Sequence, residues 1–234
     1  MPSEIYNVDY NGFINVLGTA HFTRRSLKEA RQSVETTGTR DLAIELDLKR
    51  FSLLNGTCST CPKRGVCTTK CEFIEASEAL GNVDANIWLI DMSEEEIRNR
   101  VWRLPNSWAP HRSFYPFHGV GGNDIPWLWE KGFKEEATRR SMDNLERLRI
   151  VAPNLRRVLI EERNAIMAAR LAWIATKRMD EGEKPNILAL VGAAHVQGIK
   201  RLLENPETIK ESLRTFSLPY SHPTLIRRIS VGNN

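Results

Sequence analysis

Hydrophobic positions along the chain form short apolar runs, and each run is followed by a stretch with helical periodicity. Residues 13–17 and 187–191 have the length and β-branched content of strands that are buried on both faces. Each of these runs ends in a Gly-x-x-His turn, after which apolar residues return at helical spacing. Two strand–turn–helix units of this kind predict an α/β fold.

The two Gly-x-x-His turns supply the first candidate functional residues, His21 and His195. Ligands of open α/β sheets bind in the crevice beyond the carboxyl ends of the strands. A helix that begins there adds unpaired N–H groups and the positive end of its dipole. We therefore expect both imidazoles to reach one polar crevice at one edge of the sheet.

A second set of candidates follows the first helical stretch. Residues 42–48 (LAIELDL) predict a strand in which Glu45 and Asp47 share one face, because side chains alternate along a strand. The strand closes a β-α-β unit whose sheet faces should both be covered. We expect the two acids to face the crevice of His21 with Arg50 close enough to pair; the alternative is a solvated sheet face.

Glutamates also interrupt the apolar stripes of two predicted helices. Glu72 begins a stripe that continues at Ala76, where the alternative role is that of a first-turn acid favoured by the helix dipole. Glu162 lies in the middle of the stripe of a helix predicted over 155–179. A buried carboxylate is costly unless it is paired, hydrogen-bonded or bound to a metal. We therefore favour a functional role for Glu162, with Arg163 and Asn164 as polar neighbours.

One buried cation is predicted on the helix that a capping box opens at Ser93-x-x-Glu96. Arg100 lies on the inward side of this helix, beside Ile97. It either meets buried anions or carries its charge out to solvent along an apolar stem.

All four cysteines of the chain lie in one short stretch, at Cys58, Cys61, Cys67 and Cys71. The first spacing is that of a tetrahedral metal site, so structural zinc is the leading interpretation. Paired disulfides and an iron–sulfur cluster are the alternatives. A second unusual stretch at 105–133 is rich in Trp, Pro and Gly, which predicts a lid or a substrate platform.

Composition narrows the classes of partner. The chain of 234 residues carries 33 Lys and Arg against 29 Asp and Glu, and this net charge of +4 does not predict nucleic acid as a partner. No apolar run approaches the roughly 20 residues of a membrane helix. We expect a cytoplasmic protein without a membrane partner, and a homodimer is compatible with the sequence. One domain at 1–234 should contain the cysteine insertion at 56–72 and the aromatic segment at 105–133.

These motifs together resemble the TraB/PrgY family, which is related to the Tiki proteins within an EreA/ChaN-like superfamily. The resemblance lies in residues 18–21 (GTAH), 45–47 (ELD) with Arg50, Glu72, residues 89–91 (LID) with Arg100, residues 162–164 (ERN) and residues 192–198 (GAAHVQG). It implies a three-layer α/β fold with a mixed, mostly parallel central sheet flanked by helices. The small Cys-rich insertion is an addition to the usual pattern.

The resemblance also implies a metal-dependent hydrolase or peptidase, like the Tiki relatives. On this hypothesis His21, His195 and Glu72 hold a divalent ion (Mn, Co or Zn), and Glu45 or Glu162 accepts a proton. Arg100 or Arg163 then stabilises the oxyanion of a peptide or small-molecule substrate. The alternative, suggested by family members that shut down peptide pheromones, is a pocket in which Arg50, Arg100 and Arg163 bind a peptide or anion without turnover.

Overall fold

The computed structural model of the protein describes residues 5–19, 24–56, 72–81, 85–104 and 147–226. His21, the four cysteines and the aromatic segment at 105–133 lie outside these ranges, so what we predict for them stays a prediction.

A five-stranded sheet forms the centre of the fold, in the order β1-β4-β2-β3-β5. Its strands are β1 (Ile14–Thr19), β2 (Asp41–Ile44), β3 (Asn86–Leu89), β4 (Ile187–Gly192) and β5 (Thr224–Ile226). The first four strands are parallel, and β5 pairs with β3 in the antiparallel sense. The mixed, mostly parallel sheet that we predicted is therefore confirmed.

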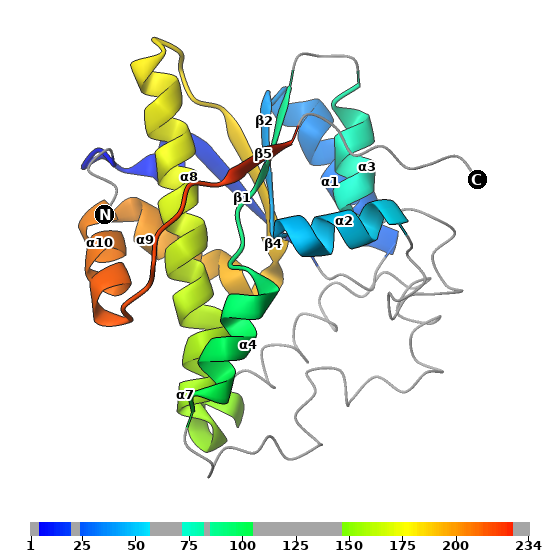
Figure 1. Cartoon of the computed structure of the whole chain (residues 1–234). Helices are drawn as coiled ribbons and strands as arrows, with labels where there is room; N and C mark the ends of the chain where they lie inside the picture. Colours follow the sequence, from blue (N-terminus) through cyan, green and yellow to red (C-terminus); the bar gives the residue numbers. More distant parts are fainter. Residues whose placement is uncertain (1–4, 20–23, 57–71, 82–84, 105–146, 227–234) are drawn as a thin grey trace.

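Helices cover both faces of this sheet (Figure 1). On one face lie α1 (Arg24–Thr37), α2 (Leu48–Gly56) and α3 (Glu72–Ala79), and on the other lie α8 (Arg163–Asp180), α9 (Val196–Glu204) and α10 (Pro206–Thr215). The shorter helices α4 (Glu94–Trp102) and α7 (Pro153–Arg156) extend beyond the sheet. Single turns of 3-10 helix precede β1, as η1 (Tyr10–Gly12), and α9, as η6 (Ala193–His195). The three-layer α/β architecture is thus confirmed.

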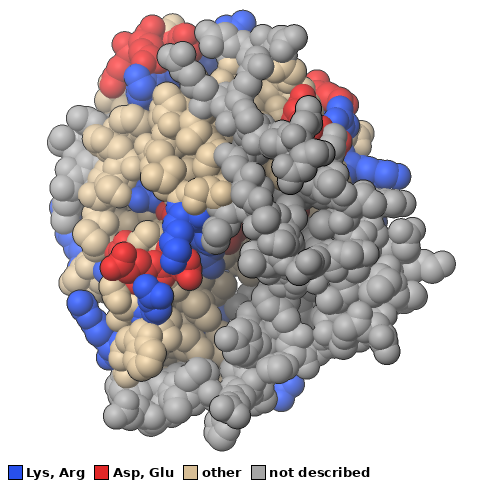
Figure 2. Space-filling view, turned by 45° about the vertical axis from the view of Figure 1, so that its right-hand side comes forward, with Lys and Arg blue, Asp and Glu red and all other residues tan. Residues whose placement is uncertain are grey.

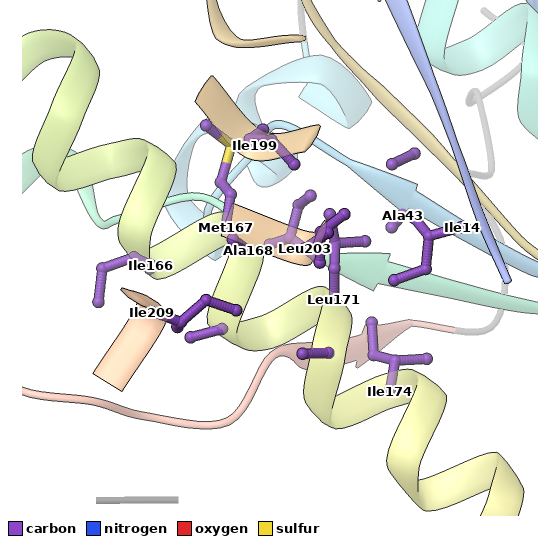
Figure 3. Packing of buried hydrophobic residues seen from close by; sticks show 14 of the residues in the cluster. Ile14, Ala43, Ile166, Met167, Ala168, Leu171, Ile174, Ile199, Leu203 and Ile209 are labelled. Atoms are coloured by element: carbon purple, nitrogen blue, oxygen red, sulfur yellow. The ribbon is translucent and has the colours of Figure 1, made fainter. Parts of the chain in front are cut away.

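The apolar stripe of α8 supplies a large part of the core on its side of the sheet. Figure 3 shows Leu171 and Ile174 of α8 near Ile14 and Ala43 of the sheet, with Leu203 of α9 completing the cluster. All six residues of β4 are buried, as expected for a strand covered on both faces. Among the described helices, none combines the length and apolar character needed to cross a bilayer.

Two helix boundaries follow from the residues that stand at them. α1 ends at Thr37, and Gly38 follows it with φ +57°, the left-handed cap that favours glycine. The Ser93 half of the predicted capping box is present, since Ser93 Oγ accepts the N–H of Glu96 at 3.1 Å.

Two predicted elements were wrong in extent. The strand expected over 42–48 ends at Ile44, because the Asp47 side chain accepts the N–H of Arg50 at 2.7 Å and thereby caps a helix that begins at Leu48. The helix expected over 155–179 is interrupted by η5 (Arg157–Glu162), a π-helical segment between α7 and α8. A π-helix is wider than an α-helix, so the angular positions calculated for an α-helix do not hold across it.

Candidate functional site

The carboxyl ends of β1 and β4 lie side by side, which brings the starts of the two Gly-x-x-His turns together. In the parallel register Thr19 is opposite Gly192. Gly18 makes this approach possible, because a Cβ added there would lie 2.7 Å from Val196 Cγ2 and 3.1 Å from Ala193 Cα. The prediction that both turns leave one edge of the sheet is therefore supported as far as Thr19, the last described residue of the first turn.

His195 is buried at this edge, with 3% of its surface exposed. Its Nδ1 lies 2.6 Å from Oδ1 of Asn164, and its Nε2 lies 3.4 Å from Oε1 of Glu45. An amide oxygen only accepts hydrogen bonds, so Nδ1 carries a proton and Nε2 is the nitrogen that faces the carboxylate.

Glu45 directly follows β2 and connects three parts of the fold. Its backbone N–H continues the sheet by donating to Leu190 O at 3.1 Å. Its Oε2 accepts the backbone N–H of Gly192, at the start of the second Gly-x-x-His turn. Its Oε1 accepts a hydrogen bond from Arg163 Nη2. The carboxylate of Glu45 is thus fixed in orientation beside His195.

Arg163 and Arg50 share the carboxylate of Asp91, which lies beyond the end of β3. Arg163 Nε donates to Asp91 Oδ1 at 3.0 Å and Nη2 donates to Oδ2 at 2.7 Å, while Arg50 Nη2 donates to Oδ2 at 2.6 Å. Burial raises the pKa of Asp91, but attraction by the two arginines outweighs it and the net effect is a lowered pKa. Burial lowers the pKa of Arg163, and the charges of Asp91 and Glu45 raise it by more. Asp91 and Arg163 are therefore both ionised at neutral pH.

Asp91 is a site residue that the sequence analysis missed. The signal was available, because Asp91 ends the apolar run at 86–91 just as Glu45 ends the run before it. In neighbouring parallel strands, acids at such equivalent positions meet at one edge of the sheet.

Asp47 and Arg50 complete this side of the site. Besides capping α2, Asp47 accepts the backbone N–H of Glu94 at the start of α4, and its Oδ2 lies 3.5 Å from Arg50 Nε. Asp47 thus joins two helix starts to the arginine that holds Asp91. Its role is to anchor the network.

Glu72 lies at the same edge, near the end of β1. It is in the first turn of α3 and is 1% exposed. Thr19 Oγ1 lies 3.5 Å from Glu72 Oε1 and 3.3 Å from the carbonyl oxygen of Val191. The position of Glu72 agrees with a role next to the first Gly-x-x-His turn.

Glu162 and Arg100, both predicted as catalytic, form a separate group. Glu162 lies 3.1 Å from Arg100 Nη1 and 3.2 Å from Arg157 Nε. Arg100 also donates to the carbonyl oxygens of Phe216 and Ser217, at 3.2 and 3.0 Å. These contacts tie α4 and η5 to the chain that leads to β5. These partners of Glu162 and Arg100 are residues other than His195 and Glu45.

Within the described residues, two side chains that could bind a metal ion, those of His195 and Glu45, face each other. No three His, Cys, Asp or Glu side chains in that part of the chain are arranged to hold a metal ion. His195 and Glu45 supply one nitrogen and one oxygen, while His21 lies outside the described ranges. The metal-ion prediction therefore stays a prediction.

Two surface hollows formed by described residues lie away from this pair. One of about 580 Å³ lies at the opposite, amino ends of β1 and β4, between Lys184 and Lys200, and one of about 350 Å³ lies between α4 and Ser217. Among the described residues, Figure 2 shows acidic and basic side chains next to one another on the face it presents.

The fold and the site define an α/β protein with buried His, Glu, Asp and Arg side chains at the carboxyl edge of its sheet. The model of the TraB/PrgY/gumN family matches residues 127–209, a stretch that includes Arg163, Asn164 and His195. This match confirms the resemblance to the TraB/PrgY family that the motifs predicted.

Among curated proteins the chain is similar to an uncharacterized protein of Methanocaldococcus jannaschii. The two sequences are 22% identical over 222 residues, which covers 83% of this chain and 54% of the relative. The chain thus spans about half the length of the curated relative that it matches. No solved structure matches the chain.

Proposed function

We propose that the protein is a metal-dependent hydrolase of the peptidase type, and that His195 and Glu45 are two of its metal ligands. One observation carries this proposal. Nε2 of His195 faces Oε1 of Glu45 at 3.4 Å, while Nδ1 is occupied by the amide oxygen of Asn164. When the His195 ring is neutral and protonated on Nδ1, the Nε2 lone pair faces a carboxylate oxygen, and a cation bound between them would remove their repulsion.

The donor chemistry fits a divalent ion. Imidazole nitrogen and carboxylate oxygen suit Mn, Co or Zn. A metal-bound histidine usually donates its other N–H to an acceptor, as His195 does to Asn164. His21 and Glu72 are the candidates for further ligands. Glu72 contacts Thr19 at the edge that carries His195, and His21 follows Thr19 by two positions in the sequence. A divalent ion there would supply Lewis-acid chemistry for the attack of water on an amide or ester bond.

The arginines beside this pair position the ligands. Arg163 donates to Glu45, to both oxygens of Asp91 and to the carbonyl oxygen of Leu159 at 3.2 Å. It thereby holds the Glu45 carboxylate in orientation, a role that differs from the oxyanion stabilisation expected from the sequence. Gly192 N–H fixes the second oxygen of the same carboxylate. The chain can thus present a carboxylate ligand that is already oriented before metal binds.

The alternative of an anion-binding pocket has less support. It requires Arg50, Arg100 and Arg163 to converge on one ligand. Arg50 and Arg163 share Asp91, whereas Arg100 is bound to Glu162 and to two backbone carbonyls. The positive charges are matched by carboxylates of the chain itself.

Elemental analysis and turnover test the proposal in a protein whose four cysteines are replaced by serine, so that any metal at those cysteines is not counted. After incubation with Mn, Co or Zn and gel filtration, we expect about one ion per chain and metal-dependent cleavage of a panel of blocked peptides and activated esters. His195→Ala and Glu45→Gln should lose both. His222→Ala is the matched control, because His222 stacks on Trp173 at a centroid distance of 4.5 Å, outside the site contacts. Metal content and turnover that survive in His195→Ala would overturn the proposal.

A further inference from the structure

Gly198 is in direct contact with the residue that holds His195. A Cβ added to Gly198 would lie 2.1 Å from Nδ2 of Asn164 and 3.0 Å from its Cγ. Gly198 is in the first turns of α9, where glycine is less favourable than alanine. A glycine at this point therefore has a packing function, which is to leave room for the Asn164 amide.

The amide of Asn164 is confined from two sides. Its nitrogen end lies against α9 at Gly198, and its oxygen end lies 2.6 Å from Nδ1 of His195. Asn164 itself belongs to α8, and the two helices pack together through a buried core that includes Ile199 and Leu203. The separation of α8 and α9 thus decides whether the amide oxygen can reach the imidazole.

We infer that Asn164 and Gly198 form a positioning pair, which fixes the neutral His195 ring as the Nδ1–H tautomer and directs the Nε2 lone pair at Glu45. The consequence for metal binding rests on the proposed function. The consequence for the tautomer does not, since it follows from contacts between side chains of the protein itself.

The chain offers informative variants. Asn164→Leu keeps the approximate size of the side chain and removes the acceptor, and Gly198→Ala leaves the acceptor in place but moves it. Asn164→Asp retains an acceptor at Nδ1 and serves as the conservative rescue. Gly12→Ala is the matched glycine control, because a Cβ at Gly12 would have no atom within 4 Å.

The first readout is the tautomer of His195 in chelator-treated protein, measured by long-range ¹H–¹⁵N correlation of the imidazole nitrogens at one fixed alkaline pH. The wild type and Gly12→Ala should show the proton on Nδ1. Asn164→Asp should also retain a proton there. Asn164→Leu and Gly198→Ala should shift population to the Nε2–H form. A merely structural role for Asn164 would not move this signal in folded protein.

The second readout is the dissociation constant for Zn²⁺ and Mn²⁺ of the cysteine-free protein. Loss of an outer hydrogen-bond partner of a metal-bound histidine typically weakens metal binding by about 10–100-fold, and we expect this loss in Asn164→Leu and Gly198→Ala. If the tautomer shifts as described but the wild type binds no metal, the proposed function fails and the positioning pair stands. If wild-type His195 carries its proton on Nε2, or if Gly198→Ala changes neither readout, the positioning pair is refuted.

Discussion

Replacing Gly198 by alanine tests the tight contact between α8 and α9. The new Cβ would lie 2.1 Å from Asn164 Nδ2, far inside van der Waals contact, so the amide or the helix must move. Overpacking a buried site costs about 1–3 kcal/mol, and loss of the Asn164–His195 hydrogen bond adds about 0.5–1.5 kcal/mol. Alanine returns about 0.5–1 kcal/mol through its higher helix propensity. We expect the free energy of unfolding to fall by about 0.5–4 kcal/mol.

A double-mutant cycle isolates the cause of this loss. In an Asn164→Ala background the two clashing amide atoms are absent, and the nearest remaining atom is Cβ of residue 164 at 3.7 Å, an ordinary contact. Gly198→Ala should then be neutral or stabilising by up to about 1 kcal/mol, so the sign of its effect reverses between the two backgrounds. Urea unfolding of the four proteins, with unchanged m-values, gives the coupling energy. Equal destabilisation in both backgrounds would refute the assignment of the clash to Asn164.

Three further predictions concern the ion pairs. Asp91→Asn should lower the free energy of unfolding by about 3–5 kcal/mol in urea unfolding, because it leaves Arg163 and Arg50 without their shared anion; a loss below about 1 kcal/mol would contradict this. Because the folded-state pKa of Asp91 is lowered, its stabilisation is complete above its unfolded pKa of about 4 and is lost as the pH falls below that value. Asp91→Asn should therefore flatten the acid limb of a stability–pH profile, and an unchanged limb would count against the ion pairs. Arg100→Ala should speed amide hydrogen exchange over 216–217, whose carbonyls it binds; exchange as slow as in the wild type would exclude this anchoring role.

Periodicity in the sequence was sufficient to predict the framework of the site. The apolar runs at 13–17 and 187–191 are neighbouring parallel strands, and their glycines open turns at one edge. This prediction succeeded because a strand buried on both faces has a strong hydrophobic signature and because parallel strands end on the same side. His195, Glu45 and Arg163 do lie together.

Two predictions that failed, the extent of the strand at 42–48 and the grouping of Glu162 with His195, have local physical causes. Asp47 fits the alternation of a strand, but it can also cap a helix. In the structure its side chain accepts the backbone N–H of Arg50 and caps α2. Glu162 does occupy a buried position, but its partners Arg157 and Arg100 come from η5 and α4. Helical periodicity assumes a rotation of about 100° per residue. It therefore predicts neither a π-helical segment nor a contact between helices that are distant in the sequence.

The position of β4 has a consequence for how the polypeptide folds as the ribosome produces it. Among the described strands β1 pairs with β4 alone. Ile14 therefore cannot form its sheet hydrogen bonds until β4, with Ile187, has been synthesised. β2 and β3 can pair much earlier, since Asp41 is matched with Asn86. The long-range pairing of β1 with β4 slows folding, because a large loop must close before the two strands come into contact. A nascent chain that stops short of β4 would therefore expose the apolar residues of β1 and is a natural client for chaperones.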